Sequence, residues 1–214
     1  LPFGENPKTG DARISGSLAS LVGLECALES GDAAAIDAAI KTIVLLHCVI
    51  LSFGGIPLLY YGDAIGTLNS LEYLADPSVA ADNRWMHRSY FDWNKAKKRH
   101  EAGTVEQSIF STLKKMIALR KETTAFADFD NRQLLAVDNP KLLVFSRSDP
   151  QQSRNRVLVV VNFNDEPQRL PLEVLRTCGF FQPDVMKDLC TGTRAEVEND
   201  ALIVPALSCQ WLTD

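Results

Sequence analysis

The residues best suited to chemistry in this sequence lie close together, between Ala81 and Trp93. Aromatic side chains alternate there with charged or ionisable ones, without a helical or strand period: Asp82, Arg84, Trp85, His87, Arg88, Tyr90, Phe91, Asp92 and Trp93. Aromatic rings offer flat apolar faces that suit the C–H faces of a sugar, while Arg, Asp and His can make charge-assisted hydrogen bonds to its hydroxyl groups. The stretch therefore indicates either a carbohydrate-binding loop or a loop that packs its own aromatic rings and pairs its own charges.

A buried helix and a short apolar run precede this loop. Asp32 is a candidate N-cap for a long helix that is apolar nearly all round over residues 43–53 and that ends at Gly54-Gly55. The run Ile56–Tyr61, bounded by Gly and Pro, is typical of a strand buried on both faces. Together they predict an αβ unit of a parallel sheet or barrel, with a long aperiodic loop over residues 63–98 after the strand.

Two further helices are indicated by apolar residues at helical spacing. One covers residues 18–28, with Ser15 or Ser17 as its candidate N-cap, and the other covers Glu106–Glu122. After Thr123 the pattern changes to short strand-like runs divided by turn dipeptides: RQLLAVD, KLLVFSRS, NRVLVVVNFN, QRLPLEV, DVMKDL, ALIVPA and SCQWLTD. Helical segments followed by strands predict two domains, residues 1–126 and 127–214, the second a small antiparallel sandwich.

The totals narrow the choice of partners. The chain has 214 residues, 46% of them hydrophobic, and a net charge of −5. A negative net charge argues against a nucleic-acid partner, because phosphate binding depends on a basic surface. No uninterrupted apolar run of about 18 residues occurs, so no membrane span is expected.

The five cysteines are odd in number and widely spaced: Cys26, Cys48, Cys178, Cys190 and Cys209. None of them forms a CxxC pair or a metal-ligand cluster with the three histidines. This pattern favours reduced, mostly buried thiols and a reducing, cytoplasmic compartment.

Several strings of the sequence resemble the α-amylase superfamily of glycoside hydrolases, and within it the amylosucrase family. LSFGGIPLLYYGDAIGTLN followed by DNRWMHRSYFDW is similar to the eighth barrel strand and its loop. GDARISGSLASLVGLE resembles the segment before the seventh barrel helix, STLKKMIALRKETTAF the eighth helix, and RVLVVVNFND the C-terminal sandwich. The resemblance implies an α/β plus all-β chain: residues 1–126 as the C-terminal portion of a (β/α)8 catalytic barrel and residues 127–214 as an antiparallel β-sandwich.

The resemblance also implies substrate-binding roles for two arginines. Arg84 matches the arginine that, in amylosucrases, pairs with an early-barrel aspartate and closes the floor of the glucose pocket, a role that suits a planar guanidinium. Arg13 matches an arginine on the acceptor side of that pocket. From the residues alone, either arginine could be a surface salt bridge. His87, between Trp85 and Arg88, is a third candidate substrate contact.

The sequence departs from the family at two positions of this region. Ala64 stands where the family usually has Glu, which removes one charge from the loop after the strand. Ser89 stands where Pro usually follows His-Arg, which changes only the rigidity of the loop.

The carboxylate pair that retaining glycoside chemistry requires is not recognised in the sequence. The family places the pair at the ends of the fourth and fifth strands, with a His-Asp pair after the seventh, and no His-Asp dipeptide occurs here. Asp63, Asp82 and Asp92 are superficially candidates, but Asp63 matches a loop position of the family rather than the nucleophile, and no Glu is spaced to partner it. We therefore assign no catalytic residue and no metal site. A chain that opens at Leu1 without a signal peptide is interpreted as a C-terminal fragment whose catalytic carboxylates lie in absent sequence.

The resemblance implies a parent enzyme that cleaves sucrose by a retaining double displacement and transfers glucose to a glucan acceptor, with no cofactor. The remainder of the barrel, from the absent N-terminal sequence, would be the main partner of this chain. Alternatives within the superfamily are a sucrose hydrolase, a trehalose synthase and an α-glucosidase. An alternative of another class is a non-catalytic carbohydrate-binding or interaction module. The fragment alone is predicted to be inactive.

Overall fold

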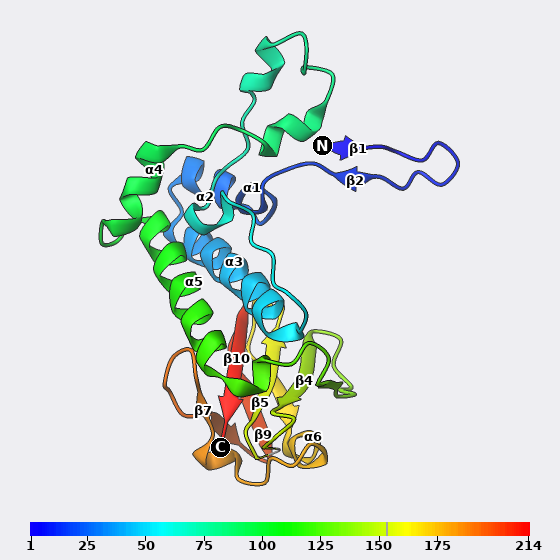
Figure 1. The fold of residues 1–214 in the computed structure, drawn as a ribbon, viewed down its shortest axis with the longest axis vertical. Helices are drawn as coiled ribbons and strands as arrows, with labels where there is room; N and C mark the ends of the chain where they lie inside the picture. The colour runs from blue at the N-terminus through cyan, green and yellow to red at the C-terminus, as the bar shows by residue number, and fades with distance from the viewer. Residues whose placement is uncertain (153) are drawn as a thin grey trace. The chain divides into compact units, whose positions relative to one another are not determined.

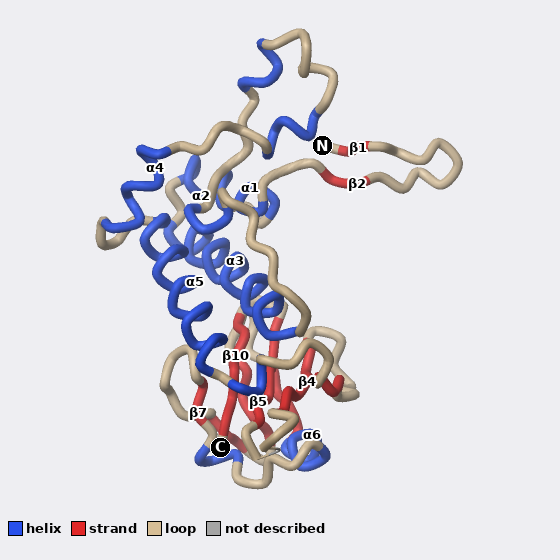
Figure 2. Tube along the Cα trace, viewed as in Figure 1, coloured by secondary structure: helices blue, strands red, loops and turns tan. Residues whose placement is uncertain are grey.

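The computed structural model describes residues 1–152 and 154–214 (Figures 1 and 2). Its backbone contacts group these residues into two compact units. Unit 1 comprises Leu1–Ile43 and Leu59–Ser111, and unit 2 comprises Val44–Leu58 and Thr112–Asp214. Two of the three divisions between the units fall inside helices and the third lies between Leu58 and Leu59, so they do not test the domain boundary expected near residue 126.

Unit 1 is built from a short hairpin, helices and 3-10 turns. The hairpin pairs β1 (Pro2–Phe3) with β2 (Arg13–Ile14). The helical elements are α1 (Leu18–Leu21), α2 (Leu24–Ser30), the first part of α3 (Ala33–Phe53), η1 (Asp63–Ile65), η2 (Glu72–Ala75), η3 (Asn83–His87), α4 (Trp93–Lys97), η4 (Lys98–His100) and the first part of α5 (Val105–Glu122).

The helix ends are where side chains of the sequence can satisfy free backbone N–H groups. The side chain of Ser17 accepts a hydrogen bond from the Ser20 N–H and begins α1. Asp32 accepts from the N–H groups of Ala34 and Ala35 at 2.9 and 3.1 Å and begins α3, which ends before Gly54 and Gly55, both with positive φ. The predicted caps and the predicted helix over Glu106–Glu122 are therefore confirmed.

The expected strand Ile56–Tyr61 is not a strand in this structure. Its residues have no regular secondary structure, and the exposed fractions of Ile56 and Leu58 are 83% and 86%. A parallel-sheet strand needs hydrogen-bonded neighbours at its edges, and no described strand pairs with this segment. The prediction of a buried strand is wrong for this chain, and the barrel is not seen. The loop that follows is also more regular than predicted, because η1, η2, η3 and α4 interrupt it.

Unit 2 contains two antiparallel sheets. The larger has the order β3-β4-β5-β10-β7, and the smaller has the order β6-β9-β8. The strands are β3 (Arg132–Leu134), β4 (Leu142–Ser148), β5 (Arg156–Asn162), β6 (Gln168–Pro171), β7 (Lys187–Asp188), β8 (Glu196–Glu198), β9 (Ala201–Val204) and β10 (Ser208–Thr213). The helical turns of the same unit are η5 (Thr124–Phe126), α6 (Leu172–Thr177) and η6 (Pro183–Val185). All strand pairs after residue 130 are antiparallel, as predicted.

The five-stranded sheet of unit 2 is covered on both faces. One face packs into a single apolar cluster with the smaller sheet and α6: Val144, Leu158, Val160, Leu170, Leu172, Leu175, Phe180, Met186, Leu202, Val204 and Leu212. On the other face, the Phe145 ring lies 5.5 Å from that of Phe53 at the end of α3, and Trp211 lies 4.8 Å from Phe126. This two-sided cover explains why β5 is apolar without alternation.

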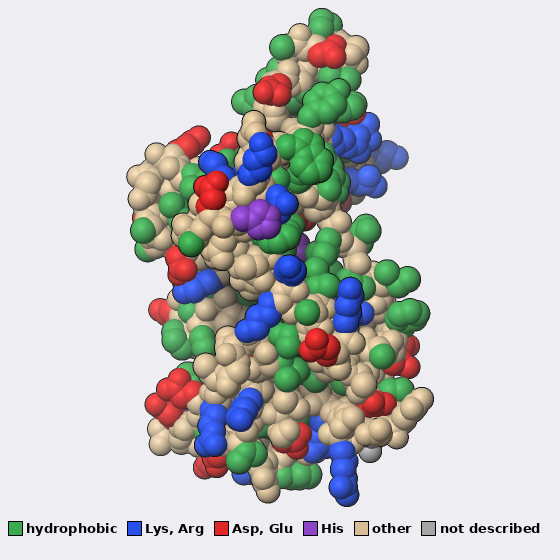
Figure 3. Space-filling model, turned by 60° about the vertical axis from the view of Figure 1, so that its left-hand side comes forward, with side chains coloured by type: hydrophobic (Ala, Val, Ile, Leu, Met, Phe, Trp, Pro, Cys, Tyr) green, Lys and Arg blue, Asp and Glu red, His purple; other side chains and the backbone are tan. Residues whose placement is uncertain are grey.

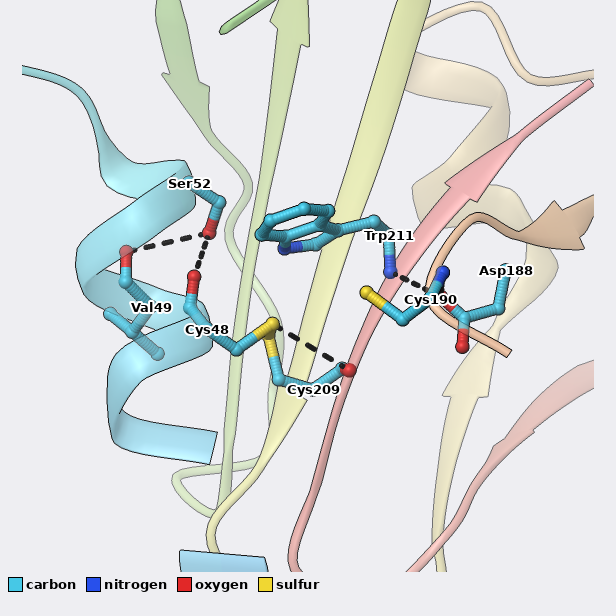
Figure 4. Close-up of a disulfide and its surroundings, with 7 residues drawn as sticks. All are labelled: Cys48, Val49, Ser52, Asp188, Cys190, Cys209 and Trp211. Carbon is cyan, nitrogen blue, oxygen red and sulfur yellow. Dashed lines mark hydrogen bonds between the residues drawn. A yellow bond between two sulfur atoms is a disulfide. The ribbon is translucent and has the colours of Figure 1, made fainter. Parts of the chain in front are cut away.

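A disulfide joins α3 to this sheet within unit 2. Cys48 of α3 and Cys209 of β10 are bonded, with their Cα atoms 6.1 Å apart and a sequence separation of 161 (Figure 4). The expectation of five reduced thiols is therefore wrong for this pair. Cys26 is also exposed rather than buried. Because the pair is brought together only by the tertiary fold, cysteine spacing could not reveal it, and the argument from the cysteines for a reducing compartment loses its basis.

A third cysteine lies beside the disulfide but remains a thiol. Figure 4 shows Cys190 close to Trp211 and Asp188, and the Trp211 N–H donates to the Asp188 carboxylate at 3.0 Å. Burial, with a smaller effect of Asp188, raises the pKa of Cys190 to about 12. A neutral thiol is a poor nucleophile.

The helix α3 is, by length and composition alone, long and apolar enough to cross a membrane. Core helices of soluble proteins have the same properties, and α3 carries the disulfide and the Phe53–Phe145 contact to the sheet. The expectation that the chain has no membrane partner stays a prediction.

Candidate functional site

The candidate site is the turn η3 and the loops that surround it in unit 1. Asp82 begins η3 by accepting a hydrogen bond from the Arg84 N–H at 3.0 Å. The same carboxylate accepts from the Arg84 side chain: Nε lies 2.8 and 3.0 Å from its two oxygens, and Nη2 lies 2.6 Å from Oδ2. Hydrogen bonding from Arg84 lowers the pKa of Asp82 to about 2, so this carboxylate is ionised at neutral pH.

The Arg84 side chain keeps part of its donor capacity for another partner. It is 42% exposed, and its guanidinium lies 4.6 Å from the centre of the Phe3 ring. The family resemblance implies that Arg84 pairs with a carboxylate of the early barrel, outside this chain. Within the chain, Asp82 accepts hydrogen bonds from Nε and Nη2 of Arg84. An exposed pair of this kind leaves room for a second acceptor.

The hairpin brings the second predicted arginine to the same region. Phe3 is the strand partner of Arg13, and the Phe3 ring is the one on which Arg84 lies. Asn83 fixes the hairpin to η3: its amide donates to the Pro2 carbonyl at 2.6 Å and accepts from the Ser15 hydroxyl at 2.9 Å. Arg84 thus lies on the ring of the residue that pairs with exposed Arg13 in the hairpin, although the two arginines are 71 positions apart in the sequence.

His87 lies at the last position of η3 and is held by its backbone. Its carbonyl accepts from the Tyr60 hydroxyl at 3.2 Å. Its ring nitrogen Nδ1 is buried, and no hydrogen-bond partner for that atom exists among the described residues. Burial, followed by repulsion from Arg88, lowers the pKa of His87 below its ordinary value. The imidazole is therefore neutral at physiological pH and has an unused polar atom.

A groove of about 230 Å³ opens on the other side of η3, lined by residues of η2 and of the loop after η3. It is lined by Ser70, Glu72, Tyr73, Asp76, Val79, Trp85, Arg88, Ser89 and Tyr90. None of the three predicted substrate-binding residues lines it. Figure 3 shows hydrophobic side chains exposed in the upper part of the view, with acidic and basic side chains among them. The sequence did not reveal this groove, because Glu72, Tyr73 and Asp76 lie outside the aromatic and charged stretch of residues 81–93.

Hydrogen bonds of the backbone and of side chains hold the loops that line the groove. The Ser70 N–H donates to the Met86 carbonyl at 2.8 Å, which ties the loop before η2 to η3. The Tyr61 hydroxyl donates to the Ser89 carbonyl at 2.6 Å. Asp76 accepts from the N–H and hydroxyl of Ser78, and these hydrogen bonds lower its pKa, so it remains ionised.

The three carboxylates that the sequence offers as catalytic candidates, Asp63, Asp82 and Asp92, lie at the beginnings of helical turns in this structure. Asp82 caps η3 and pairs with Arg84, while Asp92 caps α4 by accepting from the Asn94 and Lys95 N–H groups at 2.9 Å each. Asp63 begins η1. Over residues 1–152 and 154–214, no group of three or more His, Cys, Asp and Glu side chains could hold a metal ion. The arrangement can bind a polyhydroxylated ligand, but these carboxylates do not form a nucleophile and acid pair.

Comparisons with known proteins give the site its context. Residues 132–211 match the family described as the maltogenic amylase C-terminal domain. A cyclomaltodextrinase from Geobacillus thermopakistaniensis (strain MAS1) is 26% identical over 165 residues, which cover 77% of this chain and 24% of that protein. The chain therefore spans about a quarter of the length of this relative.

Solved structures agree with the fold over most of the chain. A pullulanase from Bacillus acidopullulyticus matches with a TM-score of 0.59 and 19% identity over 94% of this chain and 23% of that one. A pullulanase from Paenibacillus barengoltzii, in complex with maltohexaose and α-cyclodextrin, matches with a TM-score of 0.62 and 16% identity over 92% and 28%. At these identities the structures show the fold alone.

The antiparallel sheets of unit 2 lie almost entirely within the residues that match the maltogenic amylase C-terminal domain. Residues 132–211 are thus similar to the maltogenic amylase C-terminal domain, and the chain as a whole is similar to about a quarter of a cyclomaltodextrinase and of pullulanases. The superfamily resemblance expected from the sequence is confirmed at this level. The comparisons do not single out the amylosucrase family.

Proposed function

We propose that the whole protein is a retaining enzyme of the α-amylase superfamily that acts on α-glucosidic bonds, and that this chain supplies the end of its barrel and its β-sandwich. The observation that carries the proposal is the match of residues 132–211 to the maltogenic amylase C-terminal domain. The catalytic carboxylates and the other barrel strands are supplied by sequence outside this chain.

The exposed segment Ile56–Tyr61 supports this arrangement. Its apolar side chains are unfavourable in water, and its backbone groups lack strand partners among the described residues. A barrel closes only when every strand has a neighbour on each side. The segment acts as the eighth barrel strand once the remainder of the barrel pairs with it.

For the substrate we propose sucrose, with a glucan as glucosyl acceptor. The support is the string DNRWMHR, whose Arg84 lies on the ring of Phe3, the hairpin partner of Arg13, and keeps donors for a sugar or a barrel carboxylate. In this scheme one carboxylate attacks the anomeric carbon of the glucosyl unit, while a second carboxyl group gives its proton to the oxygen of the departing fructose. The covalent glucosyl group then passes to the acceptor hydroxyl, whose proton goes to the second carboxylate.

A second candidate is a hydrolase of α-1,4- or α-1,6-glucans. It is favoured by the relatives in hand, which are named cyclomaltodextrinase and pullulanase. A sucrose hydrolase, a trehalose synthase and an α-glucosidase are further forms of the same proposal, with different acceptors. A non-catalytic carbohydrate-binding module would instead bind glucans without turnover by any form of the protein.

Product analysis of the full-length protein separates these candidates. We expect fructose and a growing glucan from sucrose, and little release of reducing sugar from cyclomaltodextrin or pullulan. Cleavage of cyclomaltodextrin or pullulan with sucrose untouched would replace the first candidate by the second. The purified 214-residue chain should turn over none of the three substrates above a buffer blank. Turnover by this chain would contradict the proposal that the catalytic carboxylates lie outside it.

A further inference from the structure

We propose that three arginines at the end of α3 are positioning residues, which fix the direction in which the chain enters the segment Ile56–Tyr61. This arginine cluster consists of Arg120 of α5, Arg132 of β3 and Arg147 of β4. All three belong to unit 2, as does the end of α3. Only the consequence for catalysis rests on the proposed function, in which the segment is the eighth barrel strand.

The last turn of α3 needs partners that the helix itself does not provide. The last four carbonyls of a helix have no N–H partner within it, and the negative end of the helix dipole lies there. A basic residue in the last turn often serves this end, but the sequence of α3 has none there. Two carbonyls of that turn accept instead from side chains of other elements: Leu51 from Arg120 and Ser52 from Arg147.

The same contacts continue beyond the helix into the turn that follows it. The guanidinium of Arg120 also donates to the Gly55 carbonyl at 3.2 Å, so one planar group bridges the end of α3 and the start of the next segment. The Gly55 N–H donates to the Phe129 carbonyl at 3.1 Å. A Cβ atom on Gly54 would lie 2.5 Å from that carbonyl oxygen, and Gly54 has a φ of +124°, so the turn requires glycine there.

Arg132 completes the cluster from β3. Its guanidinium lies 4.6 Å from the centre of the ring of Phe53, the last residue of α3, and pairs with Asp130 at 3.1 Å. Burial, followed by repulsion from Arg120, lowers the pKa of Arg147 to about 10. Like charges that lie this close repel one another. The acceptors at the end of α3 are therefore what holds the three cations together.

These contacts fix the chain on both sides of the Gly54-Gly55 turn before the segment Ile56–Tyr61 begins. The direction of its first residue is thus set by unit 2, without a strand neighbour. In the whole protein, the loop that carries Arg84 follows this segment in the chain. Because a small displacement that begins far from the chemistry can cost about a hundredfold in rate, a loosened turn should impair catalysis without touching the substrate.

The test is amide hydrogen exchange of the full-length protein, measured by mass spectrometry over residues 53–58 and over β5, together with kinetics on sucrose. Arg120→Met should speed exchange over residues 53–58 by about tenfold, the size expected for one lost charge-assisted hydrogen bond, and leave β5 unchanged. We expect kcat to fall by about tenfold and KM to stay within about twofold, because the substrate still binds but is less well oriented.

Two further variants complete the experiment. Arg120→Lys keeps the charge but cannot reach both carbonyls, so it should give smaller changes of the same kind, and it carries the test if Arg120→Met does not fold. Arg169→Met is the matched control, because Arg169 also donates to two carbonyls, those of Glu198 and Asn199, in the smaller sheet. It should change neither the exchange over residues 53–58 nor kcat.

The outcomes separate the arginine cluster from the proposed function. Parental exchange over residues 53–58 in the Arg120 variants would overturn the positioning role. An equal rise of exchange in β5 would also overturn it, because Arg120 would then support unit 2 as a whole. Faster exchange over residues 53–58 with a parental kcat would show that catalysis does not depend on this turn, which again contradicts the role. A full-length protein that turns over no α-glucoside would refute the proposed function, while the exchange measurements would still decide on the cluster.

Discussion

Two apolar runs of this chain have the sequence of a buried strand, and only one of them becomes a strand. β5 pairs with β4 on one side and with β10 on the other, and Val157 to Val161 are all buried. The segment Ile56–Tyr61 has similar local features but remains exposed and without regular secondary structure. The difference does not lie in strand propensity, since both runs are apolar and bounded by turn residues.

What differs is where the partners of each run are encoded. The neighbours of β5 and the layers above and below it all come from residues 44–58 and 112–214. The segment Ile56–Tyr61 has no strand partner within the described part of the chain. Local sequence therefore sets the strand tendency, and the presence of neighbours decides whether the strand forms.

The largest expected effect comes from a matched pair of leucines, one in each run. Leu158→Ala should destabilise the chain by about 2–5 kcal/mol, because Leu158 is fully buried between the two sheets. Leu58→Ala should change the free energy of unfolding by less than about 0.5 kcal/mol, because Leu58 is exposed. Urea unfolding of the 214-residue chain, followed by circular dichroism, measures both values.

The same pair sharpens the comparison in the full-length protein. If the remainder of the barrel pairs with Ile56–Tyr61, Leu58→Ala should there become as costly as an ordinary core substitution, about 2–5 kcal/mol. If Leu58→Ala leaves the free energy of unfolding of the full-length protein unchanged, the assignment of this segment as the eighth barrel strand is refuted.

The disulfide should contribute nearly as much to the stability of unit 2 as a core leucine. Cys48 and Cys209 close a long loop and tie α3 to the strand beside β5, so Cys209→Ser should cost about 2–4 kcal/mol. The control is Cys26→Ser, because Cys26 is a free, exposed cysteine. Thermal unfolding with and without reductant gives the measurement. Five thiols that react under native conditions would show that the pair is not bonded.

Arg84 resembles the segment Ile56–Tyr61 in one respect: the partner that the family resemblance implies for it, an early-barrel aspartate, lies outside this chain. In the full-length protein, Arg84→Ala should lower kcat/KM on sucrose by about a hundredfold, because a misplaced substrate alone costs that much. Arg169→Ala is the matched control: Arg169 is also partly exposed and also pairs with a carboxylate, that of Glu198. Near-parental kcat/KM for Arg84→Ala, at an unchanged melting temperature, would show that its pair with Asp82 only holds the loop.

Prediction from sequence succeeded where a local pattern is sufficient. The caps at Ser17 and Asp32, the end of α3 at Gly54-Gly55 and the antiparallel strands after residue 130 follow from spacing and turn residues. It failed where the outcome depends on distant residues. The Cys48–Cys209 bond joins positions 161 apart, and the groove combines η2 with the loop after η3. It also failed at Ile56–Tyr61, where the pattern predicts a strand but no described strand of the chain pairs with the segment.

The smallest expected effect concerns Arg147, a charged residue that finds all its partners within unit 2. It is fully buried on the face of β4 that meets α3. Its guanidinium donates to the carbonyls of Ser52 and Asp128, each at 2.5 Å, and to the side chain of Asn131. Burial lowers the pKa of Arg147 to about 10, so it is still charged at neutral pH.

Arg147→Met keeps the length of the side chain but leaves those three acceptors unpaired, at a cost of about 1–3 kcal/mol in the free energy of unfolding. Arg169→Met, at a partly exposed position of the smaller sheet, should stay within about 0.5 kcal/mol of the parent. Urea unfolding of both variants measures the difference. If Arg147→Met leaves the free energy of unfolding unchanged, water replaces the guanidinium at these carbonyls. This face of the sheet would then be open to water, although Val157 to Val161 of β5 are buried.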